Sequence, residues 1–133
     1  MKDKESIIDT YSTIYYVDIV VCKYTTIEQL RELYDYSDTE ELGEDITHFE
    51  CSTTRCRRKS DNKDIILVCY NHDSRIVGTN KKLDLINTIT HEAGHVALDI
   101  YAHMQQDICQ CSSEPFCYLL GYIGECIYKT LTK

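Results

Sequence analysis

The chain has 133 residues, the size of one domain, because a core divided between two halves would leave each half marginally stable. Its content of 43% apolar and 27% charged residues excludes collagen-like, disordered and low-complexity classes. The formal net charge of −8 disfavours binding of nucleic acid by the general surface. We therefore expect a single domain over residues 1–133.

The beginning of the chain mixes charged residues with only two isoleucines in its first ten positions, so it has no apolar segment of a signal peptide. The most apolar run nearby, Ile14–Cys22, is interrupted by Asp18 and is far shorter than the roughly 20 residues that span a bilayer. We expect a cytoplasmic protein without a membrane anchor. In such a reducing compartment the eight cysteines are expected to be buried apolar residues or metal ligands rather than disulfides.

Three strands and one helix are predicted in the first half of the chain. β-branched and aromatic residues indicate a buried strand over Ile14–Cys22. Two overlapping capping boxes in residues 25–29 begin a helix that ends near Tyr36. The runs Thr47–Arg57 and Asp64–Tyr70 flank a turn-rich segment and predict a hairpin.

The second half of the chain predicts two long helices. The first covers about Lys81–His103, and the second covers roughly Glu114–Leu131, where Pro115 suits the first helical turn. Together these elements predict an α/β (α+β) domain, with a mixed or antiparallel sheet of about three strands packed on the two helices.

One segment, residues 35–50, holds seven acidic residues and no lysine or arginine, so it carries −7 of the net charge. The negative charge is therefore concentrated in one segment and is not spread over the surface. We expect it to serve solubility or the binding of a basic protein partner.

The sequence His91-Glu92-Ala93-Gly94-His95 lies inside the first long helix. Residues four apart lie about 40° apart around a helix, so both imidazoles project from one side and can share one zinc ion. Glu92 can reach a water molecule at that ion without being a ligand, as a general base must. An apolar stripe occupies the opposite side of the helix: Ile86, Ile89, Ala93, Val96 and Ile100.

The ten residues 88–97, T-I-T-H-E-A-G-H-V-A, resemble the extended signature of zincin metallopeptidases. A catalytic zinc normally has three protein ligands, so a third is required. The metzincin pattern would need a glycine and a histidine where this chain has Leu98 and Tyr101. His103 lies about 12 Å beyond His95 along a continuous helix, too far to bind the same ion.

Glu114 fits the third position better, because it stands 19 residues after His95 at the start of the last predicted helix. A glutamate on a second helix at this distance resembles the gluzincin arrangement, and the short domain is similar to minigluzincins. The matching part covers about residues 88–121. It departs from the family at Tyr118, where an acidic residue is expected. Gly121 shares the face of Glu114 and would allow close approach of the two helices.

The resemblance implies a zinc-dependent metallopeptidase in which His91, His95 and Glu114 bind Zn²⁺ and Glu92 is the general base. It also implies that the strand Asp64–Tyr70 offers its edge to an extended peptide or protein substrate. Asp99 could orient His95. Candidate donors to the oxyanion are led by Tyr118 and include Tyr122, Tyr101, His103 and His72.

Two other classes of function remain open. The same three ligands could hold the two helices together in a non-catalytic, zinc-stabilised binding module. Alternatively, the acidic segment 35–50 could bind a basic partner. A second, structural metal site could use Cys51 with Cys56 and Cys109 with Cys111, although neither pair has the common C-x2-C spacing. A small acidic zincin without a signal peptide would also suit a phage or mobile-element product.

Overall fold

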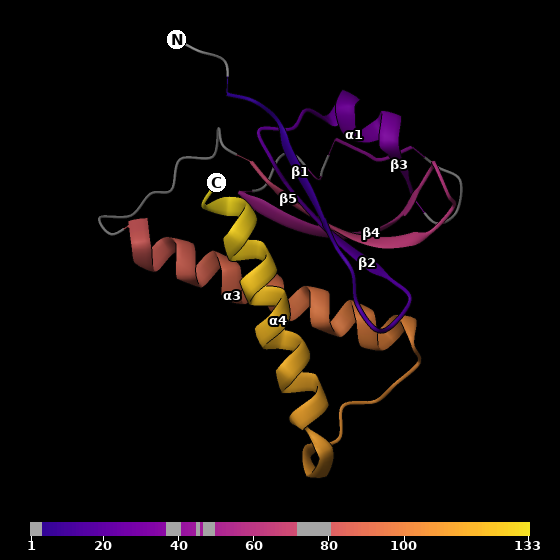
Figure 1. The fold of residues 1–133 in the computed structure, drawn as a ribbon, viewed down its shortest axis with the longest axis vertical. Coiled ribbons are helices and arrows are strands. Elements are labelled where there is room, and N and C mark those ends of the chain that lie inside the picture. The colour runs from indigo at the N-terminus through magenta and orange to yellow at the C-terminus, as the bar shows by residue number, and fades with distance from the viewer. Residues whose placement is uncertain (1–3, 37–40, 45, 47–49, 72–80) are drawn as a thin grey trace.

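The computed structural model describes residues 4–36, 41–44, 46, 50–71 and 81–133, and these form a mixed α+β domain (Figure 1). The strands are β1 (Ile7–Tyr11), β2 (Asp18–Lys23), β3 (Tyr34–Asp35), β4 (Cys51–Arg58) and β5 (Asp64–Tyr70). The helices are α1 (Ile27–Leu33), α3 (Lys81–His103) and α4 (Glu114–Leu131), with a short 3-10 helix, η1 (Gln110–Ser112), before α4. The predicted α+β class is confirmed.

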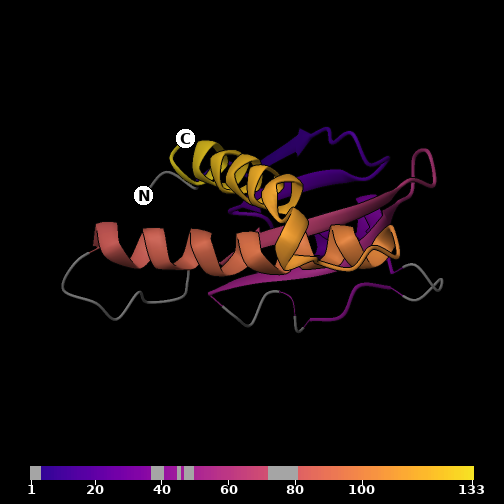
Figure 2. The same ribbon diagram turned by 90° about the horizontal axis from the view of Figure 1, so that it is seen from below.

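The sheet has the order β1-β2-β5-β4-β3, and only the β2–β5 pair is parallel among these strands. A core cluster with α3 and α4 covers one face of the sheet (Figure 2). A second cluster, with Leu30 of α1, Leu42 and Ile46, covers the other face. No described helix combines the length and apolar character needed to cross a bilayer.

The predicted elements differ from the structure mainly in the first third of the chain. The structure has five strands where about three were predicted, and β1 and β3 were not foreseen. Residues 14–16 turn the chain between β1 and β2, with Tyr16 in the left-handed region at φ 59°, so the strand predicted over Ile14–Cys22 begins only at Asp18. Both long helices have the predicted bounds. Residues 47–49 of the predicted hairpin lie outside the described residues.

A capping box begins α1, as predicted. The Thr26 hydroxyl accepts from the Gln29 backbone N–H at 3.2 Å, and the Gln29 side-chain oxygen accepts from the Thr26 backbone N–H at 2.9 Å. Of the two overlapping boxes in the sequence, the structure therefore uses the second.

Every residue of β2 is buried, including a charged residue at each end. The Asp18 carboxylate accepts from Arg58 Nη1 at 3.1 Å and from Lys63 Nζ at 2.9 Å, so it is paired with two cations. Lys23 Nζ donates to the main-chain oxygens of Leu131 at 3.0 Å and Lys133 at 2.6 Å. Because the last carbonyls of a helix have no partner within it, Lys23 caps the end of α4 and joins it to the sheet.

We predict that Lys23→Met lowers the free energy of unfolding by about 1–3 kcal/mol, because it keeps an apolar side chain and leaves two main-chain oxygens without their donor. Urea unfolding followed by circular dichroism measures this loss. The control is Lys129→Met on the exposed face of α4, which should change stability little. Equal midpoints for the Lys23 and Lys129 variants would contradict the capping role.

Candidate metal centre

The rotation of α3 about its own axis decides where the H-E-x-x-H side chains point. Ile89, Val96 and Ile100 are buried against the sheet, together with Ala93, as the predicted stripe requires. Ile86 is the exception, because it is 55% exposed. With these apolar residues inward, Glu92 lies at the buried rim of the stripe.

His91 and His95 project from the exposed side of α3 with their rings close together. Their Nε2 atoms lie 3.1 Å apart, and the ring centroids are 4.8 Å apart in an edge-to-face arrangement. Two imidazole nitrogens bound to one tetrahedral zinc ion would be about 3.3 Å apart, from bond lengths of about 2.0–2.1 Å. The spacing of this histidine pair therefore fits a shared metal ion.

Glu92 is buried beside this pair, with 5% of its surface exposed. Its Oε2 accepts a hydrogen bond of 2.6 Å from the Thr53 hydroxyl of β4, whereas its Oε1 lies 4.0 Å from His91 Nε2. The strand thus fixes one carboxylate oxygen and leaves the other directed at the histidines. A carboxylate so placed can accept a proton next to a metal-bound substrate.

Thr53 is a site residue that sequence reasoning missed. The signal that could have found it is the alternation of side chains between the two faces of β4. Thr53 and Arg55 pair with Val68 and Ile66 of β5, and both of these β5 residues belong to the core beneath α3. Directly opposed residues of antiparallel strands share a face, so polar side chains at these two positions face α3.

The Cys51 thiol also lies near Glu92. Burial raises its pKa well above the ordinary value, and the negative charge of Glu92 raises it further. Cys51 therefore stays a protonated thiol near neutral pH. Cys51 packs with the core beneath α3, whereas Cys56 packs in the cluster on the α1 side of the sheet, so the alternative in which these two cysteines share a metal site does not fit the structure.

The structure does not bring Glu114 to the histidine pair. A Cβ atom at Gly124 of α4 would lie 4.0 Å from Ile89 Cγ2, and the Tyr101 ring packs on Phe116 with centroids 5.2 Å apart. Each of these two α3 residues lies about 120° around the helix axis from His95, one on either side. Helix α4 therefore packs on α3 opposite His95.

Glu114 is exposed at the start of α4, which extends away from α3 (Figure 1). Among the described residues, no three His, Cys, Asp or Glu side chains form a group that could hold a metal ion. The prediction that Glu114 completes a site with His91 and His95 is therefore not met by this arrangement.

Tyr118 and Gly121 also lie elsewhere. Tyr118 is 75% exposed and lines a cavity of about 620 Å³ between α4 and the turn that joins β1 to β2. A Cβ atom at Gly121 would meet nothing within 4 Å, so the predicted close approach at this residue is wrong. Gly124 is the glycine that faces α3, because a Cβ atom there would lie 4.0 Å from Ile89.

The other candidate oxyanion donors have varied positions. Tyr122 donates to the main-chain oxygen of Ser12 at 2.8 Å, and Tyr101 packs on Phe116. His103 lies near Asp64, with 4.0 Å between Nδ1 and Oδ2. His72 lies outside the described residues.

The expected substrate strand, β5, is an interior strand. It pairs with β2 on one side and with β4 on the other, so its edges are already occupied and the prediction of an open β5 edge is wrong. The strand that faces the candidate site is β4, through Thr53.

Asp99 follows His95 by one turn and is half-buried. Burial raises the pKa of its carboxyl group, while the charges of Arg55 and His95 oppose this rise. Asp99 therefore lies within electrostatic reach of His95, consistent with the proposed orienting role, although no hydrogen bond joins the two within the described chain.

We predict that Thr53→Val lowers the free energy of unfolding by about 1–3 kcal/mol, because Glu92 loses its buried donor. Thr53→Ser should restore most of that stability, since it keeps the hydroxyl. The matched control is Thr54→Val on the opposite face of the same strand. Urea unfolding of the four proteins checks this, and a Thr53→Val variant as stable as the parent would argue against the hydrogen bond.

No family model, no curated protein and no solved structure matches this chain.

Proposed function

We propose that the chain is a zinc-dependent metallopeptidase in which His91 and His95 bind the metal and Glu92 is the general base. The observation that supports this proposal most directly is the 3.1 Å separation of the two Nε2 atoms, beside a buried carboxylate whose Oε1 lies 4.0 Å from His91 and accepts no hydrogen bond from the described residues. Two nearby imidazoles could also share a proton. A hydrolytic site requires an adjacent general base such as Glu92, whereas a histidine pair that only shares a proton does not.

The contacts of each residue indicate its role in the proposed reaction. The chemistry that a bound zinc ion supplies is polarisation of a carbonyl group and acidification of a water molecule. Thr53 holds Glu92 Oε2, so Oε1 is the atom placed to accept a proton. His91 has a side chain that is 64% exposed, so a substrate can approach the pair from solvent.

The site would act on a peptide-like substrate that approaches the histidine pair from solvent. Polar side chains of β4 and α3 meet beside this pair, because Thr53 of β4 donates to Glu92 of α3 and Arg55 lies on the same face of β4 as Thr53. A third zinc ligand is not contributed by α4 in this arrangement, so the proposal rests on the two histidines.

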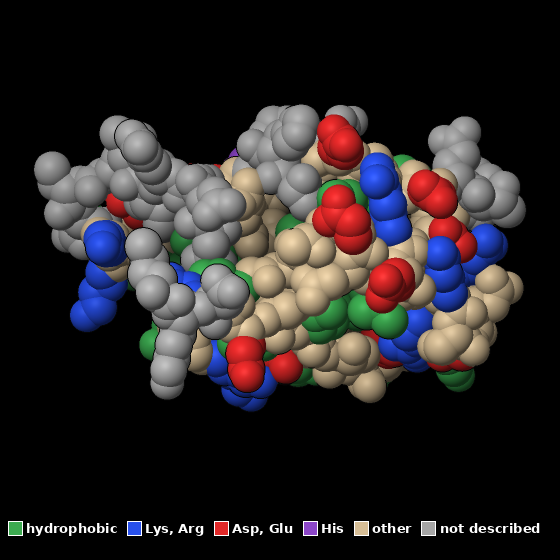
Figure 3. All heavy atoms as spheres, turned by 90° about the horizontal axis from the view of Figure 1, so that it is seen from above, with side chains coloured by type: hydrophobic (Ala, Val, Ile, Leu, Met, Phe, Trp, Pro, Cys, Tyr) green, Lys and Arg blue, Asp and Glu red, His purple; other side chains and the backbone are tan. Residues whose placement is uncertain are grey.

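The zinc-stabilised binding module has less support. Because α4 packs on α3 opposite His95, an ion bound by the histidine pair would not hold these two helices together. The acidic partner-binding alternative depends on residues 35–50, of which 37–40, 45 and 47–49 lie outside the described residues. On the described part of the face in Figure 3, acidic and basic side chains are interspersed rather than gathered by sign.

We predict that the purified protein binds one zinc ion and that His91→Ala or His95→Ala weakens this binding by about 100-fold or more, because each removes a direct ligand. Competition against a chromogenic zinc chelator measures the affinity. His103→Ala is the control, because it removes a histidine from the same helix. Equal zinc affinity in the parent and in both variants would exclude this pair as ligands.

We predict that Glu92→Gln retains zinc but loses peptide hydrolysis, because the amide cannot accept the proton while it fills the same space. Cleavage of a mixed fluorogenic peptide library by the zinc-loaded proteins provides the readout, with zinc content measured on the same samples. Turnover by Glu92→Gln at the parent rate would show that another group is the base.

A further inference from the structure

The exposed cysteines of the chain all lie on one segment, residues 109–117. All eight cysteines are among the described residues, and only Cys109, Cys111 and Cys117 are exposed, whereas the others are buried or half-buried. Unpaired cysteine is among the residue types most often buried, so packing does not explain a group of exposed thiols. Their chemical reactivity is the property that can explain this placement.

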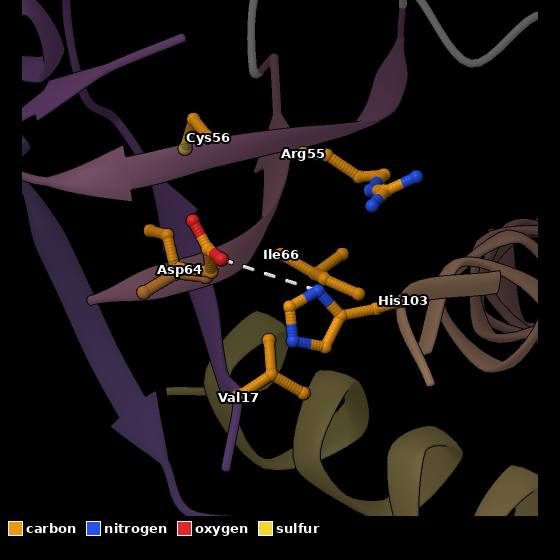
Figure 4. A pocket seen from close by; sticks show the side chains of 7 residues that line it. Val17, Arg55, Cys56, Asp64, Ile66 and His103 are labelled. Carbon is orange, nitrogen blue, oxygen red and sulfur yellow. Dashed lines mark ion pairs between the residues drawn. The ribbon is translucent and has the colours of Figure 1, made fainter. Parts of the chain in front are cut away.

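A buried cysteine has the opposite environment. Cys56 of β4 lies beside a cavity of about 50 Å³ that Asp64 and His103 also line (Figure 4). Burial, together with the negative charges of Asp35 and Asp64, raises the pKa of the Cys56 thiol to about 12. Because the thiolate is the reactive form of cysteine, Cys56 is inert near neutral pH. Reactive cysteine chemistry is therefore expected of the exposed segment.

Cys109 and Cys111 lie in one turn of the chain. Cys109 directly precedes η1, Cys111 is the middle residue of η1, and the Ser112 main-chain N–H donates to the Cys109 carbonyl oxygen at 3.1 Å. Because Gln110 between them has the backbone of a 3-10 helix, the Cα atoms of the two cysteines are about 5–6 Å apart. A disulfide needs about 4.4–6.8 Å between its Cα atoms, so this turn permits a bond between the two sulfur atoms.

The surroundings of Cys109 favour its thiolate. The Cys111 thiol stabilises this thiolate most, followed by the Cys111 main-chain N–H and the Ser112 hydroxyl, so the pKa of Cys109 lies below its ordinary value. Exchange between a thiol and a disulfide begins with attack by a thiolate. Cys109 is therefore placed to attack first, with Cys111 next to it for the second step.

Closing this bond would leave the core undisturbed. Residues 105–112 are all exposed, and Figure 1 shows the connection from α3 to α4 at the lower end of the view, away from the sheet. Exposed or strained disulfides are the easily reduced ones, and this ring is both exposed and small. The pair can therefore be oxidised and reduced again without unfolding of the domain.

A structural metal site does not account for the pair. Such a site needs four protein ligands for zinc, and two thiols supply only half of them. Within the part of the chain that the structure describes, His, Cys, Asp and Glu side chains do not gather in threes around a possible metal position. Oxidation to a disulfide needs no further ligand.

We propose that Cys109 and Cys111 form a thiol–disulfide exchange site for small disulfides such as glutathione disulfide. The Cys109 thiolate attacks one sulfur of glutathione disulfide, whose S–S bond breaks, and one glutathione leaves as a thiolate. The Cys111 thiolate then attacks the Cys109 sulfur, and the second glutathione leaves. The two protons released by the cysteines pass to the two glutathione thiolates, and the two electrons lost by the pair reduce glutathione disulfide.

Peptide mapping after oxidation tests this proposal. The protein is reduced, freed of reductant and incubated with glutathione disulfide, and the remaining thiols are blocked with N-ethylmaleimide. Chymotryptic cleavage after Tyr101 and Phe116 releases residues 102–116, which contain Cys109 and Cys111 but not Cys117. Mass spectrometry distinguishes an internal disulfide in this peptide from added glutathione. We expect the internal disulfide in the parent and its loss when excess reduced glutathione is added.

Serine variants assign the two steps. Cys111→Ser should leave glutathione attached to Cys109, because the thiol that displaces it is gone. Cys109→Ser should abolish the internal disulfide. Cys117→Ser is the matched control, because it removes an exposed thiol outside the pair, and it should be oxidised as the parent is. Since these positions are exposed, each variant should keep the urea midpoint of the parent, which shows that it is folded.

Three outcomes would overturn the inference. They are no internal disulfide in the parent at any concentration of glutathione disulfide, a bond from Cys117 to either cysteine in its place, and equal loss of oxidation in Cys117→Ser and Cys109→Ser. Zinc affinity and peptide hydrolysis are not part of this readout. Failure of the proposed peptidase function would therefore leave the exchange site standing, and failure of the exchange site would leave the peptidase proposal standing.

Discussion

The burial of one face of α3 against the sheet is the constraint on which the candidate site depends. Ile89, Val96 and Ile100 can be removed from water together only if the helix has one particular rotation about its axis. That rotation places Glu92 against β4 and leaves the two histidines at the surface. The chemistry of the site is therefore positioned by apolar residues that take no part in it.

The features that could be predicted from the sequence are those that depend on local spacing. The bounds of both long helices follow from their periodicity, and the convergence of His91 and His95 follows from a four-residue separation on a helix. The position of Glu114 relative to the histidines does not depend on local spacing. The sequence places it correctly at the start of α4, but the side of α3 on which α4 packs depends on the whole core, which no local pattern contains.

The sheet shows the same limit. Asp64–Tyr70 was correctly predicted as a strand, yet its apolar run could not reveal that β2 and β4 pair on its two sides. Parallel pairing with β2 joins residues far apart in the sequence and leaves no short-range signature. The contact between Thr53 and Glu92 follows only from that strand order, because it decides which faces of β4 and α3 meet.

The contact between Lys23 and the end of α4 has a consequence for how the protein is made. Lys23 and Leu131 are 108 residues apart, and the Tyr11 and Thr130 hydroxyls, 119 residues apart, are joined by a 2.7 Å hydrogen bond. During synthesis β2 leaves the ribosome long before the helix that covers it. Its apolar residues must stay uncovered, or be held by a chaperone, for most of the time that translation of the domain takes.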